Sequence, residues 1–360
     1  MSSLHERIAR WIRPEIRSLS AYHVPEAGGY IKLDAMENPY PWPARMVDAW
    51  LEALRAVSLN RYPDPAARRL KGQLRQAMGV PEGVGLLLGN GSDELIQMLA
   101  LAVAGAGRTV LAPEPTFVMY RLIAQVAGLE YVGVPLAGDF DLDVPAMEAA
   151  IARHEPALVF LAYPNNPTGN QFSLQAMERI IAAAPGLVVV DEAYAAFARD
   201  SFMAAIARHE HLLVLRTLSK MGLAGLRLGF LAGAEPWLTE LDKTRLPYNV
   251  NVLTQVSAEF ALAHREVLDE QTRRIRADRE TLMEALAALE GVQVYPSDAN
   301  FILFRLPAGR AHEVFEGLKA RGVLVKDLSG AGGALADCLR VTVGTAEENN
   351  TFLRTLRGLL

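Results

Sequence analysis

Between residues 84 and 231, short runs of apolar residues alternate with segments of helical periodicity. Strands are expected over 84–89, 109–112, 131–136, 157–162, 187–191, 212–216 and 226–231, and helices over 92–104, 117–127, 144–153 and 174–184. Strands that read as unbroken apolar runs are buried on both faces, so the pattern predicts an α/β fold with a mostly parallel, seven-stranded sheet sandwiched by helices. Ligands of such sheets bind beyond the carboxyl ends of the strands.

After residue 250 the order of the elements changes. The spacing predicts helices over 251–263, 266–290 and 311–321 and from residue 346, with short strands over 292–295, 300–304, 323–326 and 338–343. This mixed order is typical of a smaller α+β domain. We therefore expect an N-terminal arm over 1–43 that packs on another surface, a large α/β domain over 44–250 and a small C-terminal domain over 251–360.

Composition excludes several kinds of partner and site. The 360 residues include 36 Lys and Arg against 41 Asp and Glu, a net charge of -5, so nothing indicates a nucleic acid or an anionic membrane as partner. The one cysteine, Cys338, excludes an intrachain disulfide and a multi-cysteine metal site, and it fits a reducing compartment such as the cytoplasm. His209 and His211 lack an obvious third ligand, so no metal is expected.

Four residues with suitable chemistry lie at the ends of expected elements. Lys220 supplies an amine for a Schiff base, Asp191 an acid for a pyridinium nitrogen and Arg227 a cation for a phosphate, while Asn166 lies in a turn after the strand 157–162. A lysine at a strand end is usually a surface residue, so the combination, and not Lys220 alone, carries the argument.

A possible anion site lies where the expected strand 84–89 leads into a helix. The segment Gly89-Asn-Gly-Ser-Asp-Glu94 could direct the backbone amides of Gly91, Ser92 and Asp93 at an anion. It is not a dinucleotide fingerprint, because the third glycine of that motif would fall at Glu94. The alternative is an ordinary helix cap by Ser92 or Asp93.

With these positions in place, the sequence resembles the fold-type I, pyridoxal phosphate-dependent aminotransferases over essentially its whole length. Five motifs occur in that family's order: Tyr163-Pro-Asn-Asn-Pro-Thr-Gly169, Val190-Asp-Glu-Ala-Tyr194, Thr217-Leu-Ser-Lys220, Ala224-Gly-Leu-Arg-Leu-Gly229 and Leu339-Arg-Val-Thr-Val-Gly344. Three further segments are similar to those of the histidinol-phosphate aminotransferases: Glu37-Asn-Pro-Tyr40, Arg61-Tyr-Pro-Asp64 and Pro296-Ser-Asp-Ala-Asn-Phe301.

The resemblance implies pyridoxal 5'-phosphate as the cofactor and gives a role to each matching residue. Lys220 would bind the cofactor covalently and later move a proton between substrate and cofactor. Asp191 would pair with the pyridine nitrogen, and Tyr194 and Asn166 would hydrogen-bond the phenolic oxygen. The phosphate would be held by Gly91, Ser92, Asp93, Thr217, Ser219 and Arg227. Tyr62 would reach the phosphate of the other subunit, which implies a homodimer.

The resemblance also implies substrate contacts. Arg340 would bind the anionic group, a carboxylate in glutamate and a phosphate in histidinol phosphate. Tyr22 would close over the substrate, and Asn38 and Lys326 are the other candidates. Lys326 stands where some of these enzymes have arginine, and Met36 replaces a common asparagine. Lysine lacks the bidentate fork that arginine offers to phosphate.

The implied activity is ping-pong amino transfer between L-histidinol phosphate and 2-oxoglutarate, giving imidazole acetol phosphate and L-glutamate, a step of histidine biosynthesis. Two alternatives share the cofactor residues: an aromatic amino acid aminotransferase and a threonine-phosphate decarboxylase. A third is a non-catalytic sensor that binds the cofactor. The presence of both Lys220 and Arg340, and the absence of an added basic helix-turn-helix segment, favour an enzyme over a sensor.

Overall fold

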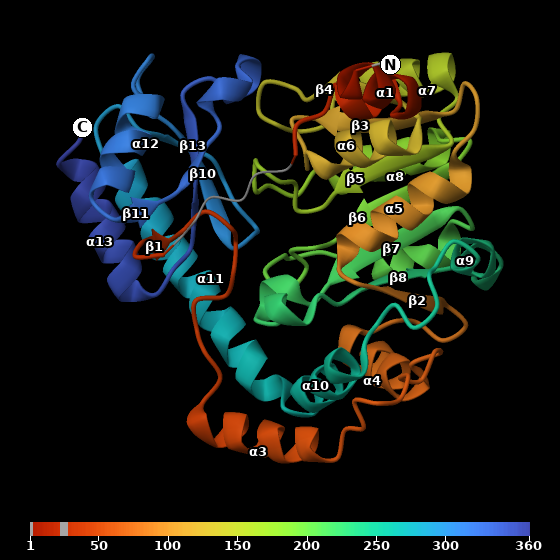
Figure 1. Ribbon diagram of the computed structural model, residues 1–360. Coiled ribbons are helices and arrows are strands. Elements are labelled where there is room, and N and C mark those ends of the chain that lie inside the picture. The colour runs from red at the N-terminus through yellow and green to blue at the C-terminus, as the bar shows by residue number, and fades with distance from the viewer. Residues whose placement is uncertain (1–2, 22–27) are drawn as a thin grey trace.

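The computed structural model describes residues 3–21 and 28–360, and its largest element is a seven-stranded sheet (Figure 1). The strand order is β2-β8-β7-β6-β5-β3-β4. Strands β3 to β7 run parallel, whereas β8 is antiparallel to both of its neighbours. The predicted mostly parallel sheet is confirmed. The strands are β2 (Gly85–Gly89), β3 (Thr109–Glu114), β4 (Glu130–Pro135), β5 (Leu158–Ala162), β6 (Leu187–Asp191), β7 (Leu212–Thr217) and β8 (Gly229–Gly233).

Helices cover both faces of this sheet. In β5, Val159 and Leu161 join one apolar core and Leu158 and Phe160 the other, as expected where successive side chains point to opposite faces. Burial of both faces explains the unbroken apolar runs of the sequence. One core includes α5 (Ser92–Val103), α6 (Met119–Ala127) and α9 (Glu235–Asp242); the other includes α4 (Arg68–Met78), α7 (Val144–His154), α8 (Leu174–Ala183) and α10 (Val252–Ala263).

A smaller antiparallel sheet, of order β12-β13-β10-β9, forms the C-terminal part. Its strands are β9 (Gln293–Val294), β10 (Phe301–Arg305), β12 (Lys326–Asp327) and β13 (Cys338–Thr342). It shares a core with helices α11 (Arg265–Ala287), α12 (Ala311–Ala320) and α13 (Ala346–Arg357). In Figure 1, α11 runs from beneath the large sheet to the small one. The buried residues of α10 pack in the core of the large sheet, although α10 follows residue 250. A domain boundary near residue 250 therefore stays a prediction.

The expected single strand over 323–326 is wrong. The structure divides this segment into β11 (Val323–Leu324) and β12, which belong to different sheets. Strand β11 pairs in parallel with β1 (Ile31–Lys32), whereas β12 pairs with β13. The reason is that a segment almost 300 residues away in sequence supplies the partner for Val323 and Leu324. This pairing fixes the chain before the large domain to the C-terminal part.

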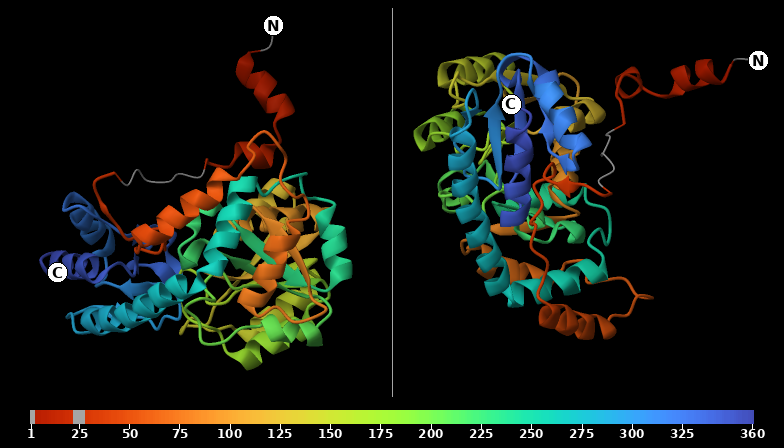
Figure 2. Two further views of the ribbon diagram at one scale, coloured as in Figure 1. Left: turned by 90° about the horizontal axis from the view of Figure 1, so that it is seen from below. Right: turned by 90° about the vertical axis from the view of Figure 1, so that its left-hand side faces the viewer.

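The N-terminal helix stands apart from the rest of the molecule. Helix α1 (Leu4–Trp11) projects from the body in both views of Figure 2, and none of its residues is buried. Leu4 and Trp11 are 69% and 75% exposed. No helix of the described ranges is long and apolar enough to cross a membrane. The remaining helices are α2 (Pro14–Arg17) and α3 (Ala44–Arg55), with short 3-10 helices η1 (Met203–Arg208), η2 (Ser219–Met221), η3 (Ala224–Leu226), η4 (Ser329–Ala331) and η5 (Gly333–Leu335).

Candidate active site

A cavity of about 390 Å³, the strand-end cavity, lies beyond the carboxyl ends of β5, β6 and β7. This is the edge at which a parallel sheet binds its ligands. The structure brings many of the predicted site residues together in its lining: Ser92, Asp93, Asn166, Asp191, Tyr194, Thr217, Ser219, Lys220 and Arg227. Phe117, Tyr120, Met36 and Glu37 line it as well.

One end of this cavity is the N-terminus of α5. The helix begins at Ser92 after Gly91, whose φ of 80° favours glycine. The backbone there lies against Gly229 of β8. A Cβ on Gly229 would come within 2.8 Å of the Gly91 carbonyl carbon and 2.9 Å of the Ser92 nitrogen. Gly229 thus allows the close approach that directs the first amides of α5 towards the cavity.

Arg227 supplies positive charge at the same end. Its Nη2 lies 3.4 Å from Asp93 Oδ2 and its Nη1 3.5 Å from Ser219 Oγ. Thr217 Oγ1 donates to Ser219 Oγ at 2.9 Å. Arg227 adopts a left-handed φ of 49°, a strained conformation that is concentrated at functional sites. Helix amides, hydroxyls and a guanidinium around one space are the groups that bind a phosphate.

Asp191 is a buried acid at the end of β6. Its Oδ2 accepts a hydrogen bond from the Tyr120 hydroxyl at 2.6 Å, and its Oδ1 accepts one from the Ala193 amide at 3.0 Å. Burial raises the pKa of Asp191 to about 6, although the hydrogen bond from Tyr120 acts in the opposite direction. Such a carboxyl group is suited to face a cation that arrives with a ligand.

Tyr120 is a site residue that sequence reasoning missed. Its side chain is 1% exposed and stacks on Phe160, with ring centroids 4.4 Å apart. Within the sequence it is one more aromatic residue in an apolar helix, and nothing there links it to Asp191, 71 residues later. Only the folded sheet places the hydroxyl at the carboxylate.

Lys220 lies between the two ends of the cavity. Its Nζ donates to the Ala35 carbonyl at 3.2 Å and lies 5.8 Å from the centre of the Tyr194 ring. Burial, followed by the charge of Arg340, lowers the pKa of Lys220 to about 8. An amine with such a pKa is partly unprotonated near neutral pH, as a nucleophile or a general base must be. Burial also raises the pKa of the Tyr194 hydroxyl.

Arg340 reaches the site from the small sheet. It is buried in β13, where its Nη1 donates to Asn166 Oδ1 and its Nη2 donates to the Asp34 carbonyl at 3.0 Å. The side chains of Arg340 and Asn166, predicted to act on substrate and cofactor, are therefore in direct contact. This contact connects the C-terminal part to the end of β5.

Several predicted residues lie outside the strand-end cavity. Tyr62 is 79% exposed and stacks on Tyr248, with ring centroids 4.3 Å apart. Asn38 donates to Gln271 Oε1 at 2.9 Å and so ties its segment to α11. Lys326 is exposed, opposite Arg340 in the pairing of β12 with β13. Tyr22 lies outside the described residues.

Met36 and Glu37 line the cavity just before Asn38. Met36 has a left-handed φ of 54°, a conformation that asparagine tolerates better than methionine. Two hydrogen bonds hold it: its amide donates to Thr342 Oγ1 and its carbonyl accepts from Asn300 Nδ2, both at 3.0 Å. Met36 departs from the asparagine common in the family that the sequence resembles, but only the structure shows that this residue borders the site.

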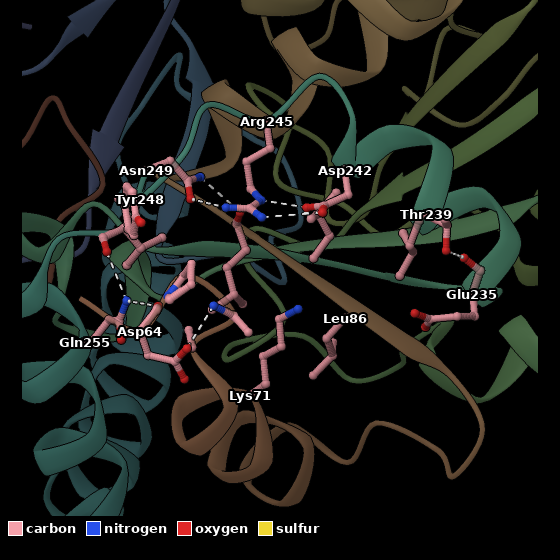
Figure 3. A pocket seen from close by; sticks show the side chains of 17 residues that line it. Asp64, Lys71, Leu86, Glu235, Thr239, Asp242, Arg245, Tyr248, Asn249 and Gln255 are labelled. Carbon is pink, nitrogen blue, oxygen red and sulfur yellow. Dashed lines mark hydrogen bonds and ion pairs between the residues drawn. The ribbon is translucent and has the colours of Figure 1, made fainter. Parts of the chain in front are cut away.

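Another cavity, of about 320 Å³, lies beside β2 and α9 (Figure 3). Lys71, Asp242 and Arg245 line it, and Arg245 Nε donates to Asp242 Oδ1 at 2.6 Å. None of the described candidate residues borders it, so it lacks the chemistry of the strand-end cavity. Among residues 3–21 and 28–360, no group of His, Cys, Asp and Glu side chains could hold a metal ion.

Comparison with known sequences identifies close relatives. The protein is 62% identical over 352 residues to "Histidinol-phosphate aminotransferase 2" of Nitrosococcus oceani, covering 98% of each chain. It is 54% identical over 356 residues to "Histidinol-phosphate aminotransferase 1" of Ralstonia nicotianae, covering 98% of this chain and 95% of the relative.

Comparison with solved structures agrees with the sequence relatives. The histidinol-phosphate aminotransferase of Sinorhizobium meliloti, solved in complex with pyridoxal-5'-phosphate, superimposes with a TM-score of 0.87 at 25% identity, covering 97% of both chains. The family model for aminotransferase class I and II matches residues 29–356, which include all the described sheets and the strand-end cavity. The chain therefore belongs to the class I and II aminotransferases.

Proposed function

We propose that the protein is a pyridoxal 5'-phosphate-dependent histidinol-phosphate aminotransferase that acts in histidine biosynthesis. It transfers an amino group between L-histidinol phosphate and 2-oxoglutarate. The proposal rests on the strand-end cavity, which has an anion-binding end, a buried acid and, between them, a lysine of lowered pKa. The chain is also 62% identical to a relative named as a histidinol-phosphate aminotransferase.

The residues of the strand-end cavity fit the cofactor. The α5 amides, Arg227, Ser219 and Thr217 would hold its phosphate, Asp191 would pair with the pyridine nitrogen, and Lys220 would bind it covalently. When bound, pyridoxal phosphate supplies the electron sink that the removal of a substrate proton requires. Asn166 and Tyr194 would hydrogen-bond the phenolic oxygen.

Protein groups would then handle the proton and the substrate. Lys220, with its amine largely desolvated, would carry the proton away from the substrate Cα. Arg340 would bind the anionic group that both amino donors possess, supported by Lys326, Asn38 and Tyr22. Because Arg340 is in contact with Asn166, substrate binding and cofactor binding would be coupled.

The choice of substrate is tested by a single-turnover absorbance experiment on the cofactor-loaded enzyme without a keto acid. Histidinol phosphate and glutamate are each expected to shift the cofactor band to that of the amino form, with phenylalanine much slower. A faster reaction with phenylalanine would indicate an aromatic aminotransferase, and CO2 release from threonine phosphate would indicate a decarboxylase. If no amine shifts the band, the enzymatic proposal itself fails.

The same proposal includes a cytoplasmic homodimer in which Tyr62 completes the other subunit's site. Large apolar side chains near Tyr62 are open to solvent in the single chain: Leu59 and Leu246 are each 72% exposed, and Tyr248 is 39% exposed. A second copy packed there would bury them, since contiguous exposed apolar side chains often mark an interface. The stacking on Tyr248 holds Tyr62 in an outward position.

Mixing two defective variants tests this arrangement. Tyr62→Ala should weaken cofactor binding and Lys220→Ala should be inactive. In a hybrid dimer, one site carries both changes and the other carries neither if Tyr62 acts across the interface, so random mixing should restore about a quarter of native activity. Sedimentation verifies that dimers form. No gain above the average of the two parents would contradict the shared site.

A further inference from the structure

A third cavity, of about 640 Å³, lies behind the strand ends and is called here the arginine cavity. Its walls are the end of α4, the segment after β6, the end of β7 and the first three turns of α11. Ala193 and Thr217 border both this cavity and the strand-end cavity. The two cavities therefore share a wall, although the arginine cavity contains none of the groups assigned to the cofactor's phosphate except Thr217.

Positive charge exceeds negative charge around the arginine cavity. The ionisable side chains in its lining are Arg216, Arg265, Arg273, Arg276, Glu192 and Asp269. Glu192 pairs with Arg216 at 2.7 Å and Asp269 with Arg265 at 3.1 Å. Arg273 pairs with Glu270, which it shares with Arg274 outside the cavity. Four arginines against two carboxylates give the lining side chains themselves an excess of two positive charges, before the contribution of Glu270 just outside the lining.

Main-chain carbonyls fix most of these guanidinium groups without neutralising them. Arg216 Nη1 donates to the Met78 carbonyl at 3.0 Å, and Arg265 donates to the Ala77 carbonyl, both at the end of α4. Arg276 Nη2 donates to the Ala196 carbonyl at 2.6 Å. Burial lowers the pKa of Arg276, and the charge of Arg279, which lies outside the cavity lining, acts in the same direction. The groups are held in place before any ligand arrives, which lowers the entropic cost of binding.

We propose that the arginine cavity binds a phosphate dianion, either inorganic phosphate or a phosphate monoester, in addition to the phosphates bound in the strand-end cavity. The excess of two charges matches a dianion, and guanidinium groups bind phosphate through paired hydrogen bonds. A phosphate concentrates both charges on one centre, which suits arginines gathered round one cavity better than the separated charges of a dicarboxylate. The volume also admits a small organic group.

The location of the arginine cavity would allow such a ligand to affect the active site. Helix α11 contributes three of the four arginines and continues into the small sheet, whereas Arg216 directly precedes Thr217 of the strand-end cavity. A phosphate bridging these elements would stabilise their contact. We therefore expect phosphate to raise the melting temperature of the cofactor-loaded enzyme as well as to bind.

Calorimetric titration of the full-length, cofactor-loaded enzyme with inorganic phosphate tests the proposal. Arg276→Gln is expected to weaken phosphate binding about tenfold, the loss typical of one charged hydrogen bond. Because Arg276 also holds the chain at Ala196, Arg273→Gln, with its side chain 69% exposed, serves as a second variant that is safer for folding. Arg274→Gln is the matched control, since it removes the same charge from the same helix but outside the cavity.

The outcomes separate the possible sites. Binding that weakens in Arg276→Gln and Arg273→Gln but not in Arg274→Gln supports the proposal, and titration with glycerol phosphate then distinguishes a monoester site from one that takes only the free ion. Equal affinity in all these variants, or binding lost only when Arg340 is replaced by Gln, would assign the phosphate to the substrate site and overturn it. Tighter binding of 2-oxoglutarate at the arginine cavity would overturn the choice of phosphate.

Discussion

Replacing Lys220 by alanine is expected to abolish amino transfer with every donor. The change removes both the amine that would bind the cofactor covalently and the base that would move the substrate proton. Of the groups lining the strand-end cavity, Lys220 is the one whose pKa burial lowers to about 8, within reach of neutral pH. Loss of a general base alone costs about a hundredfold to ten thousandfold in rate, so the combined loss should bring turnover to background.

Stopped-flow and steady-state assays with histidinol phosphate measure this effect, and Lys71→Ala is the matched control. Burial also lowers the pKa of Lys71, but that amine faces the separate cavity shown in Figure 3. The control should keep most of its activity and its cofactor absorbance. If Lys220→Ala turned over at a rate near that of the control, the assignment of Lys220 would have to be abandoned.

The large sheet could be predicted from the sequence because the pattern that marks each of its strands is local. A strand buried on both faces reads as an apolar run whatever its neighbours, and the expected and observed bounds of β6 coincide at 187–191. The same holds for the residues at strand ends. Asp191 is the last residue of β6 and Lys220 lies shortly after the end of β7, and a parallel sheet must bring those ends together.

The features that the sequence did not reveal depend on contacts between distant segments. Tyr120 meets Asp191 only because the sheet places β3, which precedes α6, one strand away from β6. The division of 323–327 between two sheets depends on β1, and the left-handed backbone of Met36 depends on the hydrogen bond that its amide donates to Thr342 and the one that its carbonyl accepts from Asn300. None of these partners leaves a periodic signal, so periodicity could not identify them.

Asp191→Asn is expected to lower turnover by about a hundredfold or more, the usual loss when a preorganised electrostatic partner is removed. The asparagine keeps the shape of the side chain and can still accept the Ala193 amide hydrogen bond, but it has no negative charge to hold a proton on the pyridine nitrogen. Steady-state kinetics at saturating cofactor would measure the change. Turnover within a few-fold of the native rate would exclude this role for the carboxylate.

The same substitution should change how the stability of the cofactor-free protein depends on pH. Folding raises the pKa of Asp191 from 3.8 to about 6, so the folded state binds the proton more tightly than the unfolded state. The contribution of Asp191 to stability is therefore complete below pH 4 and is lost as the pH rises through about 6, a change of about 3 kcal/mol. Asp191→Asn lacks this loss, so it should gain stability relative to the native protein between pH 4 and 7.

Urea denaturation of the cofactor-free proteins at several pH values between 4 and 8 measures this difference. Tyr120→Phe provides an independent check, because it removes the hydrogen bond that lowers the pKa of Asp191 and should move the transition to higher pH. Parallel stability curves for the native protein and Asp191→Asn would show that the buried carboxyl group does not titrate in this range. Above about pH 6 the buried carboxylate lowers the stability of the cofactor-free protein, but in the loaded enzyme it would pair with the cationic ring of the cofactor. Such a loss of stability is expected at a site that is built for binding and catalysis.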